Sequence, residues 1–493
     1  MKLKWTLFLS IIVFIHCQLI PMPGMNRIKG KVRASDSKPV TNARITASPD
    51  RDSSDVRYAY TDTQGKWALT GLYGGRWTFT ITAPAYISQS VEKKIKRLLP
   101  NRLNVTLDKI PSKEKLSIPL YDICLQFMKD HQIPGMAIGV VHQSQVIFTG
   151  EFGSKNFLLS GPITSHTVFN LASISKLFVA AAIIKLAHQG IIDLDAPVAN
   201  YLPYFQLKQK VYRFITIRHL LTHRSGLPRG PKFLLFPPEH DDASLKRSVI
   251  RLKHLDITVN PGGKWRYSNI GYNILGALIA EVTGQSFESY IRDHIFLPLE
   301  MYDTTYFKAE IPAEQMACPH FRQGETILTA IDNDHRPYAP SAGLFSTLHD
   351  MIHWAQAHLA NGSYNEFHLY PADVFPQVLI PQAETGLPSS EQYMGLGWFL
   401  GTYKGHRLAG HSGEQVGYKS HFLLLPDDHL GVIVMINCEE APLAELSAQL
   451  LDLLLRFAPL NPDQDPNAAP KKLKVRVDIS RGVPRYGIGG KSP

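Results

Sequence analysis

The chain has 493 residues, of which 44% are hydrophobic, and a formal net charge of +10 at pH 7. Residues 471–493 alone hold seven Lys or Arg against one Asp, so the rest of the chain is near neutral and nucleic-acid binding is not indicated. The four cysteines are far apart and include no Cys-x-x-Cys pair, and no Gly-rich phosphate loop occurs, which argues against a disulfide framework, zinc ribbons and nucleotide binding.

Residues 1–20 carry Lys2 and Lys4 ahead of an apolar run that extends to Ile15. A basic start followed by an apolar run of this length is typical of a secretory signal peptide and is short for a membrane span. We therefore expect export to the periplasm, the cell envelope or the extracellular space. Cleavage, an uncleaved anchor and lipidation at Cys17 all stay open, because His16 before that cysteine matches a lipoprotein signal poorly.

Residues 26–109 predict a small all-β sandwich with antiparallel strands. Turn signals separate short runs of alternating apolar and polar residues at 27–33, 43–47, 66–70, 76–83 and 102–107. Three turn segments, at 39–43, 61–65 and 71–75, resemble those of carboxypeptidase-regulatory-like, transthyretin-like modules. The resemblance implies a spacer or docking surface rather than a catalyst. Sugar or protein binding stays open, because the segment contains no evident aromatic platform.

Ser173 and Lys176 form a Ser-x-x-Lys pair in an apolar, alanine-rich run, 169–190, that predicts a helix opening near Ser173 and ending at Gly190. The same spacing occurs three more times in the chain, so the pair alone is weak evidence. In a first helical turn, unpaired N–H groups and the helix dipole favour negative charge on an alkoxide. Lys176 would share the face of Ser173, and burial would make its neutral, proton-accepting form accessible. A capping serine beside a solvated lysine is the alternative.

His219 and His223 lie four residues apart on a predicted helix, which is a spacing that two zinc ligands can have. Residue 220 is Leu where a zinc peptidase would need Glu, and no other ligand pair stands out. We therefore interpret both histidines as structural and expect neither a metal nor another cofactor.

Tyr267 and Asn269 stand two residues apart, just before a run at 270–283 that predicts a helix. Alternation over three residues places both side chains on one side of a loop. A phenol there could relay a proton to a leaving group, and the amide could bind a substrate carbonyl. A buried tyrosine that is hydrogen-bonded to the backbone is the alternative.

His411, Ser412 and Gly413 lie between two apolar segments that predict strands of one sheet. Such a strand would present two polar side chains to a substrate, and the glycine would let a substrate backbone approach closely. The N–H of Glu414 could complete an oxyanion hole with the N–H of Ser173. An ordinary polar edge strand is the alternative.

Residues 459–493 are rich first in Pro, Asp and Asn and then in basic residues and glycine, which predicts a disordered tail. Two interpretations stay open for this tail and for the N-terminus. Either they associate with a membrane or with anionic polymers of a cell envelope, or the tail is merely solvated.

Residues 113–458 resemble the superfamily of serine β-lactamases, penicillin-binding proteins and D-peptidases, and within it the class C β-lactamase-like branch. Besides the three motifs, the resemblance extends to connecting stretches at 217–227, 267–276, 282–288, 298–301 and 342–347. It implies an α+β fold in which an antiparallel sheet is flanked by helices, with an all-helical lobe beside it.

The resemblance also implies roles for four residues. Ser173 would be the acylated nucleophile, Lys176 its proton acceptor and Tyr267 a partner in proton transfer. His411 would be the substrate anchor, but class C β-lactamases carry Lys at this position. A largely neutral imidazole holds a carboxylate less strongly. In this respect the chain resembles D-aminopeptidases and esterases.

The predicted function is a serine hydrolase that forms an acyl-enzyme on Ser173 from an amide or ester. The substrate would be a small molecule or peptide, namely a D-amino-acid peptide, a small ester or a β-lactam. A binding or scaffold protein with a catalytically silent fold of this type is the alternative.

Overall fold

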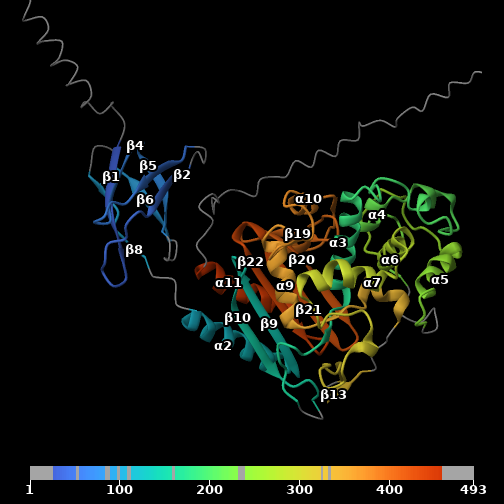
Figure 1. Cartoon of the computed structure of the whole chain (residues 1–493). Coiled ribbons are helices and arrows are strands. Elements are labelled where there is room, and N and C mark those ends of the chain that lie inside the picture. The colour runs from blue at the N-terminus through green and yellow to red at the C-terminus, as the bar shows by residue number, and fades with distance from the viewer. Residues whose placement is uncertain are drawn as a thin grey trace, which may run out of the picture.

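The computed structural model describes residues 26–50, 55–83, 89–96, 100–107, 113–157, 161–230, 239–323, 326–330 and 335–457. The predicted signal segment at 1–20 and the predicted tail at 459–493 lie outside these residues. No helix within the described ranges combines the length and the apolar composition that crossing a bilayer requires. The described residues form an N-terminal β-sandwich and a larger domain of mixed helices and strands (Figure 1).

The N-terminal sandwich has two sheets, one built around β1 and one in the order β3-β2-β5-β6. Its strands are β1 Asn26–Ala34, β2 Arg44–Pro49, β3 Arg57–Tyr60, β4 Lys66–Leu72, β5 Gly75–Thr82, β6 Gln89–Ile95, β7 Asn101–Arg102 and β8 Val105–Leu107. Inward-facing side chains such as Ile28, Trp77 and Phe79 form its core.

The strand pairing in this sandwich corrects the antiparallel prediction. β1 pairs antiparallel with β4 but parallel with β7 and β8. Strands β3 and β6 were not among the predicted runs. Alternation in the sequence fixes which side chains face inward, but it does not encode the direction of a neighbouring strand.

The larger domain is built on an eight-stranded sheet in the order β10-β9-β22-β21-β20-β19-β18-β17 (Figure 1). Every neighbouring pair in this sheet is antiparallel. Its strands are β9 Gly135–His142, β10 Gln145–Gly153, β17 Ala383–Glu384, β18 Tyr393–Met394, β19 Phe399–Tyr403, β20 His406–Gln415, β21 Tyr418–Leu425 and β22 Leu430–Ile436.

Helices cover both faces of this sheet. On β9, Met136 and Ile138 pack into one hydrophobic core with α2 and α11, whereas Ala137 and Val141 pack into another with α3 and α9. The helices are α2 Lys113–His131, α3 Ser175–His188, α4 Ile217–Leu221, α5 Ser244–Ile250, α6 Asn269–Thr283, α7 Phe287–Ile291, α8 Ala339–Ala342, α9 Leu348–Leu359, α10 Val374–Val378 and α11 Leu443–Phe457. Burial on both faces explains the nearly continuous apolar sequence of β9.

A helical lobe beside the sheet is centred on α6, which contacts α3, α4, α5, α7 and α8. Residues 270–279 of α6 are all buried, as expected for a helix that is apolar on every side. The predicted α+β fold, with an antiparallel sheet, flanking helices and a helical lobe, is confirmed. Three short strand pairs complete the domain: β11 Phe169–Asn170 with β14 Phe345–Ser346, β12 His320–Gln323 with β13 Thr326–Thr329, and β15 Ser363–Tyr364 with β16 Phe367–His368.

Candidate active site

Ser173 is the accessible point of an otherwise buried segment. In the fully described run 167–184, every residue except Ser173 is buried. Ser173 belongs to a short 3-10 turn, η1 (Ala172–Ile174), directly before α3, rather than to α3 itself. Ala172 has a φ of 49°, and its N–H donates to Asn170 Oδ1 at 2.8 Å. The N–H groups of Ile174 and Ser175 donate to backbone carbonyl oxygens, so among the described contacts of this turn the N–H of Ser173 is the one left to stabilise an oxyanion.

Lys176 lies directly beneath the serine and is fully buried. Its Nζ donates to Ser173 Oγ at 3.0 Å and to the carbonyl oxygen of Ser341 at 2.6 Å. Desolvation, with a smaller contribution from the charge of Arg229, holds the pKa of Lys176 well below its usual value. The neutral amine is therefore accessible, which is the form that can accept the serine proton.

Tyr267 approaches the same oxygen from the helical lobe. Its hydroxyl donates to Ser173 Oγ at 2.9 Å. Its ring stacks with Phe399, with centroids 6.3 Å apart and planes at 10°, and lies 4.4 Å from the ring of His223. Burial raises the pKa of Tyr267, although the hydrogen bond to Ser173 partly opposes this. The phenol therefore stays protonated and can act as a proton donor.

His223 fixes the backbone on both sides of Tyr267. Its carbonyl oxygen accepts the Arg266 N–H at 2.8 Å, and its Nδ1 accepts the Ser268 N–H at 3.1 Å. His219 has a different task, because its Nδ1 accepts the Thr216 N–H in the capping box of α4. Within the described ranges, no three His, Cys, Asp or Glu side chains are arranged to hold a metal ion.

The carbonyl of Ser341 is held in place by the segment that follows it. Leu171 N–H donates to Leu344 O at 2.8 Å, and Leu344 N–H donates to Ser175 Oγ at 3.0 Å. These bonds tie the segment that contains Ser341 to the turn that carries the nucleophile.

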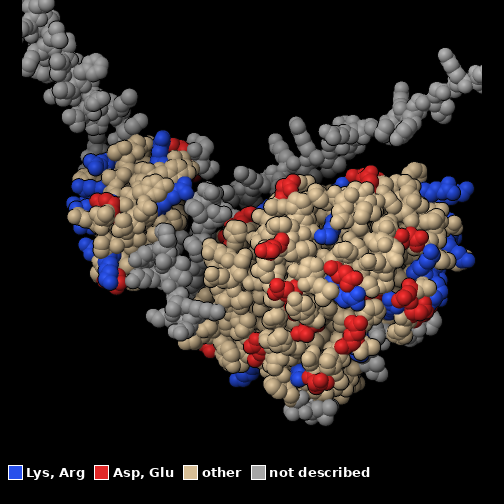
Figure 2. Space-filling model, in the orientation of Figure 1, with Lys and Arg blue, Asp and Glu red and all other residues tan. Residues whose placement is uncertain are grey.

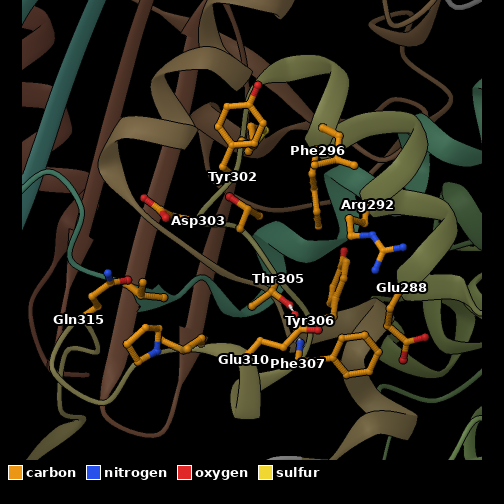
Figure 3. Close-up of a pocket in the computed structure, with 16 residues that line it drawn as sticks. Glu288, Arg292, Phe296, Tyr302, Asp303, Thr305, Tyr306, Phe307, Glu310 and Gln315 are labelled. Carbon is orange, nitrogen blue, oxygen red and sulfur yellow. Dashed lines mark hydrogen bonds between the residues drawn. The ribbon is translucent and has the colours of Figure 1, made fainter.

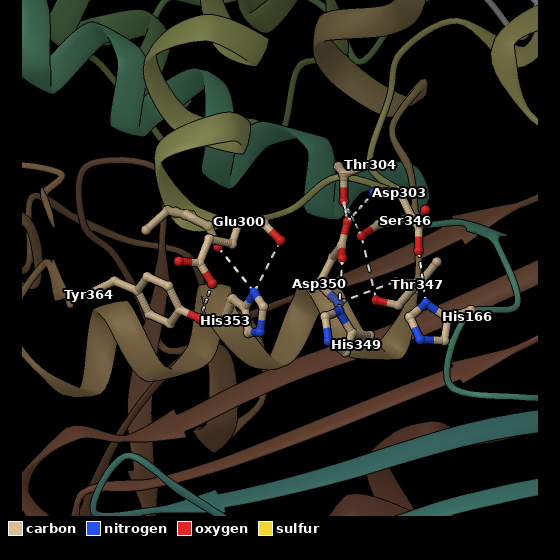
Figure 4. Close-up of polar contacts among 11 residues, drawn as sticks. His166, Glu300, Asp303, Thr304, Ser346, Thr347, His349, Asp350, His353 and Tyr364 are labelled. Atoms are coloured by element: carbon tan, nitrogen blue, oxygen red, sulfur yellow. Dashed lines mark hydrogen bonds and ion pairs between the residues drawn. The ribbon is translucent and has the colours of Figure 1, made fainter.

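Farther along, Asp350 at the start of α9 anchors the same segment (Figure 4). Its Oδ2 accepts from Thr304 Oγ1 at 2.7 Å, and Thr304 Oγ1 lies 2.7 Å from Ser346 Oγ. Thr347 caps α9 by accepting the N–H of Asp350 at 3.1 Å. Burial raises the pKa of Asp350. This buried network holds the segment that contains Ser341, whose carbonyl oxygen accepts from Lys176 although the two residues are 165 positions apart in the sequence.

His411 lies on β20, as predicted, but it is 3% exposed. Its Nδ1 lies 2.6 Å from the carbonyl oxygen of Ser412, which makes Nδ1 the protonated nitrogen. Nε2 is buried and has no hydrogen-bond partner among the described residues. Desolvation, reinforced by the charge of Lys176, lowers the pKa of His411 to about 3. A neutral ring whose Nε2 has no partner among the described residues therefore stands at the position of the predicted anchor.

Gly413 lets a neighbouring segment of the chain approach β20 closely. A Cβ at this position would lie 2.2 Å from both Leu171 O and Ser420 Oγ. The close approach is therefore made by the turn before Ser173, not by a substrate backbone on that side. Ser412 and Glu414 are exposed, as strand alternation requires when His411 and Gly413 are buried.

The register of β20 leaves one of its edges available. The pairing of β19 with β20 ends at Gly410, whereas β21 pairs with β20 as far as Gln415. Residues 411–415 thus extend beyond β19 on the side away from β21. This is compatible with the predicted use of the Glu414 N–H in an oxyanion hole, which stays a prediction.

Asn269 and Arg229 complete the surroundings of Tyr267. The N–H of Asn269 donates to Arg229 O at 2.9 Å, and its side-chain Oδ1 is buried without a partner among the described residues. The guanidinium of Arg229 lies 5.4 Å from the Tyr267 ring centroid and is exposed. Sequence reasoning did not identify Arg229, because nothing in its local sequence indicates that it stands beside Tyr267.

A separate cavity of about 170 Å³ lies between α7 and the segment 301–315 (Figure 3). Its three acidic groups are already engaged: Glu288 binds Arg336 with two hydrogen bonds, Glu310 accepts from Thr305 Oγ1 at 2.6 Å, and Asp303 Oδ2 lies 2.9 Å from His166 Nδ1. None of the predicted site residues lines it, and we assign it no ligand.

Comparison with known proteins identifies both parts of the chain. A family model described as Beta-lactamase matches residues 122–455, and one described as Carboxypeptidase regulatory-like domain matches residues 27–108. "Protein flp" from Staphylococcus aureus (strain MW2) is 28% identical over 316 residues, which are 62% of this chain and 60% of that protein. "Putative beta-lactamase-like 1" from Homo sapiens is 26% identical over 351 residues, which are 68% of this chain and 67% of that protein.

Solved structures agree with this assignment. The octameric penicillin-binding protein homologue from Pyrococcus abyssi matches with a TM-score of 0.59 and 25% identity, covering 69% of this chain and 78% of that chain. A class C beta-lactamase matches with a TM-score of 0.58 and 18% identity, covering 69% of this chain and 96% of that chain. The second likeness concerns the fold alone.

Proposed function

The chain belongs to the beta-lactamase family, and we propose that it is a serine hydrolase that cleaves an amide or ester through an acyl-enzyme on Ser173. The observation that carries the proposal is the convergence of Lys176 Nζ and Tyr267 OH on Ser173 Oγ, at 3.0 and 2.9 Å. No carboxylate among the described residues compensates the buried amine of Lys176. Such an uncompensated buried lysine is costly in a purely structural role, which disfavours a silent scaffold.

Acylation follows from the protonation states that burial favours. Neutral Lys176 accepts the proton of Ser173 as Oγ attacks the substrate carbonyl carbon. The tetrahedral oxyanion is stabilised, as we propose, by the N–H groups of Ser173 and Glu414. The proton then passes through the Tyr267 hydroxyl to the leaving amine or alcohol, the bond from carbonyl carbon to leaving group breaks, and the acyl group stays on Oγ. Attack by water on this ester releases the acid and restores the serine.

The polar groups around the site favour a substrate with a negative charge near the scissile bond. Arg229 is an exposed cation beside Tyr267, and its guanidinium has no ion-pair partner among the described residues. These features support a carboxylate-bearing amide or ester, with a D-amino-acid peptide as one such substrate.

Ser173→Ala tests the proposal against a catalytically silent fold. Hydrolysis of p-nitrophenyl acetate and labelling by a fluorophosphonate should fall by about 10³-fold or more. Ser90→Ala is the matched control, because Ser90 heads another Ser-x-x-Lys spacing but is exposed on β6. Turnover that persists in folded Ser173→Ala protein would refute the nucleophile.

Export of the protein is proposed from the pattern of residues 1–20 alone. Expression of the full chain in a bacterial host, followed by fractionation and sequencing of the mature N-terminus, measures it. Recovery of the uncleaved chain in the cytoplasm would contradict the proposal.

A further inference from the structure

Strand β1 of the N-terminal sandwich carries a continuous row of basic side chains. Its exposed positions include Arg27, Lys29, Lys31 and Arg33, which alternate with inward-facing residues. Neighbouring strands extend the row, because Lys66 on β4 lies opposite Lys31 and Arg102 on β7 lies opposite Lys29. We call this surface the basic face, formed by Arg27, Lys29, Lys31, Arg33, Lys66 and Arg102.

This arrangement opposes stability, because like charges that face each other directly across paired strands repel. None of the six cations has a carboxylate within ion-pair distance among the described residues. Elsewhere in the same sandwich, Arg76 pairs with Asp50 and Glu92, and Arg57 pairs with Asp55. The cations of the basic face are therefore not neutralised by carboxylates, as Arg57 and Arg76 are. An anionic partner would supply the missing negative charge.

The basic face is hollowed into an open groove of about 640 Å³. Five of the cations line it, together with Gly30, Trp67, Ala68, Asn104, the half-exposed ring of Tyr60 and one carboxylate, Asp62. Asp62 Oδ1 accepts the backbone N–H groups of Gln64 and Lys66 at 2.8 Å, so the five cations still outnumber the single acid in the groove. Figure 2 shows Lys and Arg gathered on the side of the sandwich where Figure 1 places β1. Successive charges along β1 are about 6.7 Å apart, twice the rise per residue, so they can meet repeating anionic groups of an extended chain.

We propose that the basic face binds a linear acidic polysaccharide and so docks the hydrolase on an anionic glycan. A single-stranded nucleic acid fits less well, because Tyr60 is the one exposed aromatic ring described in the groove, and successive bases need several such platforms. A membrane fits less well too, because a concave groove follows a chain better than a plane of headgroups. The proposal does not depend on the reaction at Ser173.

The test is fluorescence anisotropy of the full-length protein with a labelled heparin dodecasaccharide at 50 and 200 mM salt. Lys29→Gln, Lys31→Gln, Lys66→Gln and Arg102→Gln are combined in one variant. A matched variant removes the same charge from the tail through Lys471→Gln, Lys472→Gln, Lys474→Gln and Arg476→Gln. The face variant should bind at least about tenfold more weakly, and the slope of log affinity against log salt should fall by about one per cation removed.

The tail variant should bind heparin as the wild type does, and both variants should keep wild-type hydrolysis of p-nitrophenyl acetate. If the fourfold variant does not fold, Lys31→Gln combined with Lys66→Gln should give about half the change in slope. A labelled 12-nucleotide DNA strand and phosphatidylglycerol vesicles should both bind more weakly than heparin. Absence of heparin binding, loss of binding in the tail variant alone, or equal or tighter binding of DNA or vesicles would overturn the proposal.

Discussion

Replacing Arg229 by Gln removes the exposed positive charge beside Tyr267 and should weaken binding of substrates that carry a carboxylate. At about 5 Å, a unit charge attracts a carboxylate by about 0.8 kcal/mol in bulk water and about 3 kcal/mol at an effective dielectric constant of about 20. Because the guanidinium is exposed, the lower part of this range applies. A loss of about 1 to 2 kcal/mol raises KM roughly fivefold to thirtyfold.

The assay compares mono-p-nitrophenyl succinate with p-nitrophenyl butyrate, which share a leaving group but differ in charge. Arg229→Gln should raise KM for the succinate ester only, and Arg213→Gln, an exposed arginine in the turn 210–214, should change neither. Arg229 also helps to lower the pKa of Lys176. Its removal should raise that pKa and move the rising limb of kcat/KM for the neutral ester to higher pH. An equal increase in KM for both esters would refute the electrostatic assignment.

Three further predictions concern protonation and packing. Lys176→Arg keeps the charge but cannot supply a neutral base, so kcat/KM on p-nitrophenyl acetate should fall by about 10²- to 10⁴-fold. The variant should also lose the rise of kcat/KM with pH that we expect in the wild type well below pH 10.5, and a variant that keeps this rise would exclude Lys176 as the base. Because burial lowers the pKa of His411 to about 3, His411 is neutral from pH 5.5 to 8. The wild type and a His411→Gln variant should therefore show the same pH profile of KM for the succinate ester. A step near pH 6.5 that is present in the wild type and absent from the variant would show that the imidazole titrates there. Gly413→Ala should destabilise the protein by about 1 to 3 kcal/mol in thermal unfolding, since the added Cβ would lie 2.2 Å from Leu171 O. Gly271→Ala is the control and should not destabilise the protein, because its added Cβ would meet its first neighbour at 3.6 Å. Equal melting temperatures for both variants would contradict the packing argument.

The sequence by itself determined the elements that depend on local pattern. An apolar, alanine-rich run predicted α3 to within two residues of its start, and the run at 270–283 predicted α6. Alternation predicted most strands of the sandwich and placed the third motif on β20. Helix and strand periodicity are properties of neighbouring residues, so they can be interpreted without knowing the fold. The three motifs were found because their spacing is local as well.

Only the tertiary structure decided how the motifs work together. Ser341 O reaches Lys176 from about 165 residues away, Arg229 stands over the ring of Tyr267, and Leu171 O fills the space that Gly413 leaves. The sequence left His411 with the ordinary pKa of an imidazole, but burial beside Lys176 lowers that pKa to about 3. These features depend on desolvation and on contacts between distant segments. Local sequence does not encode them, because the packing of the whole domain sets which groups lose water and which charges come close.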